Sequence, residues 1–132
     1  MPENKEIIYK NLCFKINSEF DYLEVLVDNI NFCDQKSYIA SVSILLEFAL
    51  TVHPRYIILN KLESDFKIIP ELYQFTSKNI IDPLKTDGVR RIICLASENE
   101  CQTHYSEIER IEPFIKGFSS RAEAHQWISE NE

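Results

Sequence analysis

Glycine is scarce in this chain, which has only Gly88 and Gly117 among its 132 residues. Phosphate-binding loops and dinucleotide-binding turns need several glycines at fixed spacing, because only glycine lets the backbone approach a phosphate closely. The sequence therefore excludes both kinds of nucleotide site. Gly88 follows a helical pattern and precedes an apolar run, so we expect it at a helix-to-strand turn.

Long hydrophobic runs and paired cysteines are also missing. No apolar stretch approaches the roughly 18–20 residues that a membrane-spanning helix needs. The N-terminus lacks the basic start and apolar run of a secretory signal. None of the four cysteines forms a Cys-x-x-Cys pair. We expect a cytoplasmic protein with reduced thiols and no membrane insertion.

Basic residues are in the minority, 14 against 21 acidic ones, which gives a net charge of −7. This balance argues against a nucleic-acid partner, because nucleic acids are bound by clustered Lys and Arg. The excess is concentrated in residues 98–132, which hold eight glutamates and three basic residues. A charged partner of this region should therefore be basic.

The apolar pattern changes period along the chain. Three short N-terminal runs, near residues 7–9, 12–16 and 22–27, favour strands, the second and third through period-two alternation. Helical spacing follows over residues 37–52, with Asp34 as the expected N-cap and Pro54 as the stop. A second helical pattern covers residues 69–84, and Pro83 should kink or end it.

The remaining segments show strand and helix patterns in turn. Residues 55–60 and 89–96 are apolar runs typical of buried parallel strands. Residues 97–110 are polar and predicted partly helical. Residues 111–118 predict an edge strand interrupted by Pro113. The Ser120–Glu123 capping box begins a final helix.

This order predicts an α/β protein with a mixed sheet in a single domain spanning residues 1–132. An N-terminal antiparallel meander should precede a parallel βαβ core, with the helices mainly on one face. An uncovered apolar sheet face would indicate a homodimer, because large exposed apolar patches usually mark interfaces.

Four stretches of the sequence, together with this order, resemble the SpoIIAA-like (STAS) family: Tyr56–Asn60, Ile69–Leu84, Gly88–Ile93 and Phe118–Ile128. The closer similarity is to small stand-alone bacterial STAS-like proteins. These have the same fold and some similarity to CRAL-TRIO lipid-binding domains. The resemblance implies a non-enzymatic regulatory or protein-interaction module with an unidentified protein partner. The expected working surface is the loop Lys61–Lys67 with the start of the following helix, and its binding residues are Asn60, Lys61, Ser64 and Asp65.

Ser64 is a candidate phosphoacceptor by the same resemblance. Anti-sigma factor antagonists carry a Ser or Thr in an Asp-Ser-Ser-Gly-like turn after the central strand. Here Asn60 stands where the acidic residue is expected, and no glycine follows Ser64. The alternative is an ordinary solvated loop serine, which the like charges of Glu63 and Asp65 favour because they would repel a phosphate.

Two other groups of residues invite a functional interpretation. Cys101 and His104 have a Cys-x-x-His spacing, but zinc needs about four ligands and the chain offers no second pair. We therefore expect no metal, no cofactor and no enzyme activity, which would require a cleft where Cys101, His104 and an acid converge. A set of C-terminal aromatic residues would line a pocket for a small apolar ligand or lipid, or else close the core: Tyr105, Phe114, Phe118 and Trp127.

Two histidines receive structural assignments. His53, at a helix end, should contact the last carbonyl groups of that helix. His125, in the final helix, is expected to be exposed.

Overall fold

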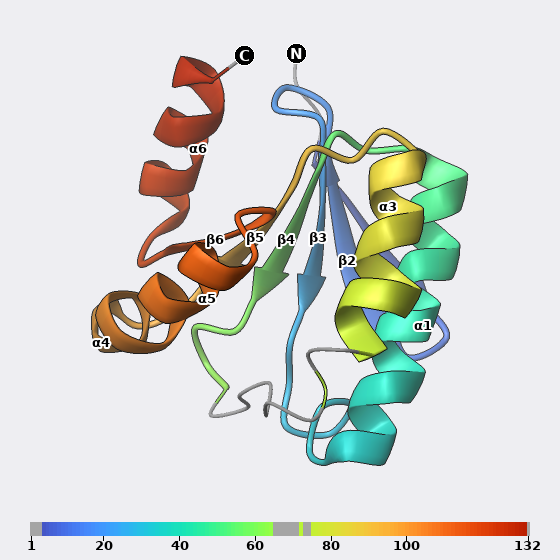
Figure 1. Ribbon diagram of the computed structural model, residues 1–132. Helices are drawn as coiled ribbons and strands as arrows, with labels where there is room; N and C mark the ends of the chain where they lie inside the picture. Colours follow the sequence, from blue (N-terminus) through green and yellow to red (C-terminus); the bar gives the residue numbers. More distant parts are fainter. Residues whose placement is uncertain (1–3, 65–71, 73–74, 132) are drawn as a thin grey trace.

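The computed structural model describes residues 4–64, 72 and 75–131, and its centre is a six-stranded mixed sheet (Figure 1). The strands lie side by side in chain order, antiparallel from β1 to β3 and parallel from β3 to β6. The meander and the parallel core predicted from the sequence are both confirmed. The strands are β1 (Asn4–Tyr9), β2 (Leu12–Asn17), β3 (Tyr22–Leu26), β4 (Tyr56–Asn60), β5 (Arg91–Leu95) and β6 (Ile115–Phe118).

Helical segments connect the parallel strands and end the chain. Two of them, labelled η, are π-helical turns: η1 runs directly into α3, and η2 joins α4 to α5. The helical segments are α1 (Gln35–Val52), η1 (Ser77–Ile81), α3 (Asp82–Thr86), α4 (Glu98–Glu100), η2 (Cys101–Tyr105), α5 (Ser106–Ile111) and α6 (Arg121–Glu130).

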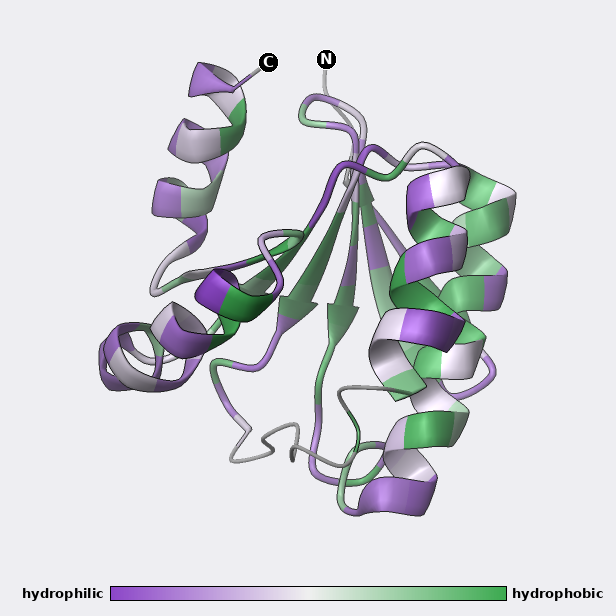
Figure 2. Cartoon of the chain, in the orientation of Figure 1, coloured by the Kyte–Doolittle hydropathy of each residue, from purple (hydrophilic) through white to green (hydrophobic). Residues whose placement is uncertain are grey.

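Most helices cover one face of the sheet, as predicted. Each parallel crossover moves one strand along the sheet in the same direction, so a common handedness places the connecting helices on one side. The larger apolar core lies there, beneath α1, α3 and α5, and includes Phe14, Val25 and Ile57. Of the described helices, α6 alone covers the other face (Figures 1 and 2). Its residues Ala124 and Ile128 pack there on a smaller apolar cluster.

Helix α1 begins and ends at the residues that the sequence indicates. The Asp34 carboxylate accepts the Ser37 backbone N–H at 2.7 Å, and the Ser37 hydroxyl accepts the Asp34 N–H at 3.0 Å. At the other end His53 adopts a left-handed conformation (φ 56°) and donates its N–H to the Ala49 carbonyl, just before Pro54. The predicted contact of His53 with the last helix carbonyls is thus made by its backbone N–H, while its side-chain Nδ1 lies 2.9 Å from Oδ2 of Asp87.

Pro83 neither ends nor breaks the second helix within its described part. It occupies the first turn of α3, directly after the π-helical turn η1, and the helix continues to Thr86. The wider turn changes the hydrogen-bond pattern at the place where Pro83 has no N–H to donate. Gly88 follows with φ +99°, which confirms the predicted helix-to-strand turn. The beginning of the predicted helix at residues 69–71 lies outside the described residues.

The segment from 97 to 118 is more helical than predicted. A continuous helical stretch covers residues 98–111, and β6 starts only at Ile115. The prediction of a strand from Ile111 was therefore wrong, because Ile111 closes α5 and Pro113 separates the two elements. The predicted edge position of this strand is confirmed by the strand order.

The part of the sheet that α6 leaves uncovered is mostly polar. On that face β1 and β2 carry Glu6 and Lys15, whose charged groups lie 3.9 Å apart, next to Cys13 and the 79% exposed Ile8. This surface is mixed in character, and a homodimer remains a prediction. No helix within the described residues is long and apolar enough to cross a membrane.

Candidate functional site

The predicted interaction loop leaves the sheet at the carboxyl end of β4. In open α/β sheets this edge is where ligands usually bind. Asn60 ends the strand and donates its side-chain N–H to Oε2 of Glu24 at 3.0 Å, while its Oδ1 accepts the Leu62 N–H at 3.2 Å. The Asn60 amide is thus used to hold the start of the loop. Asp65, predicted to bind, lies outside the described residues.

Lys61 is buried rather than presented to a partner. Only 3% of it is exposed, and its Nζ lies 2.7 Å from Oε2 of Glu100 in α4. Ser97 caps that short helix by accepting the Glu100 N–H at 3.2 Å. The ion pair therefore joins the end of β4 to the segment after β5, and the Lys61 charge is already matched.

Ser64 is buried as well, with 5% of its surface exposed. Its hydroxyl donates to Oδ1 of Asn29, in the segment after β3, at 3.1 Å. The alternative of a solvated loop serine is therefore wrong. Phosphorylation remains a prediction, but a kinase would first have to expose this side chain, and the Lys61 amine would have to leave Glu100 to reach the phosphate.

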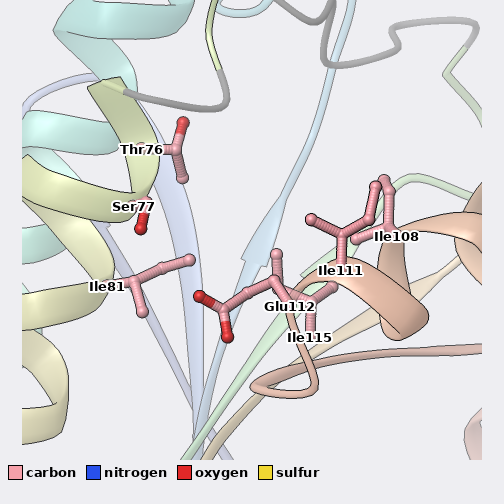
Figure 3. A pocket seen from close by; sticks show the side chains of 7 residues that line it. All are labelled: Thr76, Ser77, Ile81, Ile108, Ile111, Glu112 and Ile115. Atoms are coloured by element: carbon pink, nitrogen blue, oxygen red, sulfur yellow. The ribbon is translucent and has the colours of Figure 1, made fainter.

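An apolar groove opens next to this region, between η1–α3 and α5. Figure 3 shows isoleucine side chains from both sides facing it, with the Glu112 carboxylate reaching across. Its volume is about 170 Å³. The lining residues are Thr76, Ser77, Ile81, Ile108, Ile111, Glu112 and Ile115.

Ile111 is the most exposed apolar side chain of the groove, at 69%. The opposite wall is fixed, because the Thr76 hydroxyl lies 2.6 Å from that of Tyr38 in α1. Sequence reasoning missed this site, since it assigned Ile111 to a strand. The helical spacing of Ile108 and Ile111 was the signal that could have revealed it.

The α4–α5 segment beside the groove is acidic. Residues 98–112 carry five glutamates and one basic residue, Arg110. Three of these glutamates also form ion pairs with lysines outside the segment: Glu100 with Lys61, Glu109 with Lys116 and Glu112 with Lys85. The segment itself is acidic, as the sequence indicated, but these lysines match much of its negative charge.

Among the described residues, Cys101 and His104 are not part of a metal site, and Cys101 lacks the features of a nucleophile. Burial raises the pKa of the Cys101 thiol, which is the opposite of what a reactive thiolate needs. The Cys101 Sγ lies 3.8 Å from the Ala96 carbonyl oxygen, and His104 packs edge-on against Tyr105. No group of three His, Cys, Asp or Glu side chains among the described residues could hold a metal ion.

The aromatic residues predicted to line one pocket are divided by the sheet. Tyr105 and Phe114 belong to the core beneath α1 and α3, whereas Phe118 and Trp127 pack with α6 on the other face. The four residues do not line one pocket together, but Phe114 and Trp127 both line a pocket at the end of the sheet where β4 and β5 begin.

His125 is half-buried rather than exposed. Its ring stacks on Phe20 with centroids 4.2 Å apart, and its Nε2 lies 3.0 Å from the Tyr22 hydroxyl. Burial, with a smaller contribution from the Arg121 charge, lowers the pKa of His125.

Comparison of the chain with family models, with curated proteins and with solved structures finds no match.

Proposed function

We propose that this protein is a non-enzymatic regulatory or protein-interaction module of STAS-like type. The resemblance rests on the order of elements and on the sequence stretches given above. The observation that carries the binding role is the groove between η1–α3 and α5, which adjoins the helix after β4 and leaves Ile111 69% exposed. A concave site with a mostly apolar lining is typical of binding sites.

The size of the groove favours a protein partner over a small apolar ligand or lipid. Small-molecule sites commonly measure ~300–1,000 Å³, and the groove measures about 170 Å³. A cavity of ~150 Å³ holds one benzene-sized group. The groove therefore suits a single apolar side chain of a partner better than an acyl chain.

The charge beside the groove specifies the chemistry of that partner. Glu112 lines the groove itself and belongs to the segment 98–112, which carries five glutamates and one arginine. A segment with an apolar anchor residue flanked by Lys or Arg would be complementary in both shape and charge. The loop residues Asn60, Lys61 and Ser64 then hold the neighbouring structure in place rather than touch the partner.

Site-specific photo-crosslinking tests the proposal. A photoreactive amino acid is placed at Ile111 and, as a matched control, at Ile8, which is 79% exposed on β1. In a lysate of the native source, a protein should be captured at position 111 and not at position 8. The cross-linked segment should contain an apolar residue flanked by basic ones, and an Ile111→Glu variant should compete poorly for the purified captured protein. Capture of the same protein from both positions would contradict the proposal.

A small apolar ligand or lipid is the second candidate, because the groove is apolar. Native mass spectrometry of freshly purified protein distinguishes the two. A mass increase of a fatty acid that disappears in Ile111→Glu would favour the ligand, whereas a clean unliganded mass with no thermal shift from added fatty acids would remove it.

A further inference from the structure

A basic pocket lies at the opposite end of the parallel strands from the predicted interaction loop. It forms where β4 and β5 begin and where α6 ends, and its volume is about 410 Å³. This value falls within the ~300–1,000 Å³ of small-molecule sites. The lining residues are Tyr56, Lys85, Val89, Arg90, Arg91, Phe114, Trp127 and Asn131.

The charged side chains among the described lining residues of the pocket are all positive. They are Lys85, Arg90 and Arg91, although the chain as a whole carries a net charge of −7. Lys85 also forms an ion pair, with its Nζ 3.7 Å from Oε2 of Glu112, which lines the apolar groove. Three cations around one concave site hold a positive potential that attracts anions.

Arg91 has a donor that is not satisfied by the described residues. Its Nη1 donates to the Arg90 carbonyl at 2.6 Å, which fixes the guanidinium, but its Nε is buried and has no hydrogen-bond partner there. A buried donor without a partner costs free energy. An oxygen atom of an anionic ligand at this position would satisfy it, and guanidinium groups match phosphate and carboxylate oxygens well.

The walls of the pocket are aromatic. Tyr56 and Trp127 meet edge to face with ring centroids 6.3 Å apart, and the Lys85 amine lies 5.1 Å from the centroid of the Phe114 ring. Flat apolar surface next to cations favours a ligand that has both an apolar body and an anionic head. It is less suited to a fully hydrated inorganic ion.

We propose that this pocket binds a small organic anion, with a phosphate or carboxylate head on Arg90, Arg91 and Lys85 and a flat apolar body against Trp127. The pocket shares no lining residue with the apolar groove, so it would give the binding module a second, small-molecule input. The proposal stands or falls independently of the protein partner.

Trp127 makes the test direct, because it is the only tryptophan of the chain. Its fluorescence is followed during titration with phenyl phosphate and with phenylacetate, which differ in head group. Inorganic phosphate tests the head alone, and benzylamine tests the ring with a cation in its place. Calorimetry with the same four probes covers binding that leaves the emission unchanged.

We expect saturable binding of phenyl phosphate or phenylacetate. It should be tighter than the binding of inorganic phosphate, and benzylamine should not bind. The anion that binds more tightly identifies the head group. Arg90→Gln removes an exposed cation and should weaken binding about tenfold or more. Arg110→Gln is the matched control, since it removes an exposed arginine of α5 outside the pocket.

Four results would overturn the proposal. The first three are no saturable binding of either organic anion, equal affinity for benzylamine, and an Arg90→Gln variant that is folded by circular dichroism but binds as the wild type does. Equal affinity for phosphate and phenyl phosphate would equally contradict the apolar part of the site.

Discussion

Arg121, the first residue of α6, places its Nη2 2.6 Å from Oε2 of Glu24, a carboxylate of β3 that is only 3% exposed. Its Nε also lies 3.3 Å from the other carboxylate oxygen, and Asn60 donates to the same group. The contact joins residues 97 positions apart in the chain. It fixes the start of α6 on the sheet beside the strand that ends at the interaction loop.

Replacing Arg121 by Met should destabilise the protein by about 2 kcal/mol. Removing one partner of a buried pair costs ~3–5 kcal/mol because the other charge stays buried, and partial exposure of the Arg121 side chain reduces this. Urea unfolding at neutral pH measures the change. Arg110→Met is the control: its pair with Glu107 is exposed and should contribute less than about 1 kcal/mol. An equal loss of unfolding free energy in the two variants would contradict the stabilising role of the Arg121–Glu24 pair.

The two glycines should respond differently to substitution. A Cβ on Gly117 would lie 2.6 Å from Cβ of Tyr105, so Gly117→Ala and Gly117→Asn should both cost about 2 kcal/mol through overpacking. Gly88 has φ +99° and open space around it, so its cost is a backbone cost. There Gly88→Asn should be milder than Gly88→Ala, because Asn tolerates positive φ better. Thermal unfolding of the four variants measures these differences. A smaller destabilisation by Asn than by Ala at both positions would contradict the steric explanation for Gly117.

Folding stability should fall in weak acid because of His125. Its pKa is lowered in the folded protein, so the unfolded chain takes up the proton first as the pH drops below about 6.5. The His125 contribution is fully present above pH ~6.5 and is lost as the pH falls toward the folded pKa. An NMR titration of the imidazole should give a midpoint below the ordinary value. A midpoint at or above it would contradict the burial argument, and a His125→Phe variant should lose this part of the pH dependence.

The four cysteines should differ in reactivity toward a thiol reagent. Cys33 is exposed and should react first, whereas Cys94 is buried and burial raises the pKa of its thiol to about 12. Cys94 should therefore react only when the protein unfolds. Mass-spectrometric mapping of a time course checks the order. Modification of Cys94 under native conditions at the rate of Cys33 would be inconsistent with the core described above.

Local features of the fold were predictable because their signals lie within a few residues. Asp34 caps α1 and Ser120 caps α6 through side chains next to the helices they begin. The apolar runs at β4 and β5 are typical of buried strands. The strand predicted from Ile111 was wrong because Pro113 suggested an interrupted strand and not a boundary between two elements.

The candidate site was less predictable because it depends on distant contacts. Glu24 alternates with apolar neighbours and looks like an exposed strand residue until Arg121 closes over it. Lys61 and Ser64 look like solvated loop residues, but Glu100 and Asn29, 39 and 35 positions away, hold them inside. The groove requires α5 and η1 to face each other across the helical layer, which no local pattern specifies.

The affinity of the cross-linked partner for variants of the groove tests the proposed interaction most directly. Calorimetry should show binding by the wild type and by Ile8→Glu, and a loss of about tenfold or more for Ile111→Glu. Burial of one Ile side chain is worth ~1.5–3 kcal/mol, which corresponds to that loss. Binding should also weaken at higher salt if the partner is basic. Equal affinity of Ile111→Glu and Ile8→Glu, with no dependence on salt, would contradict the proposal that the groove is the interaction site.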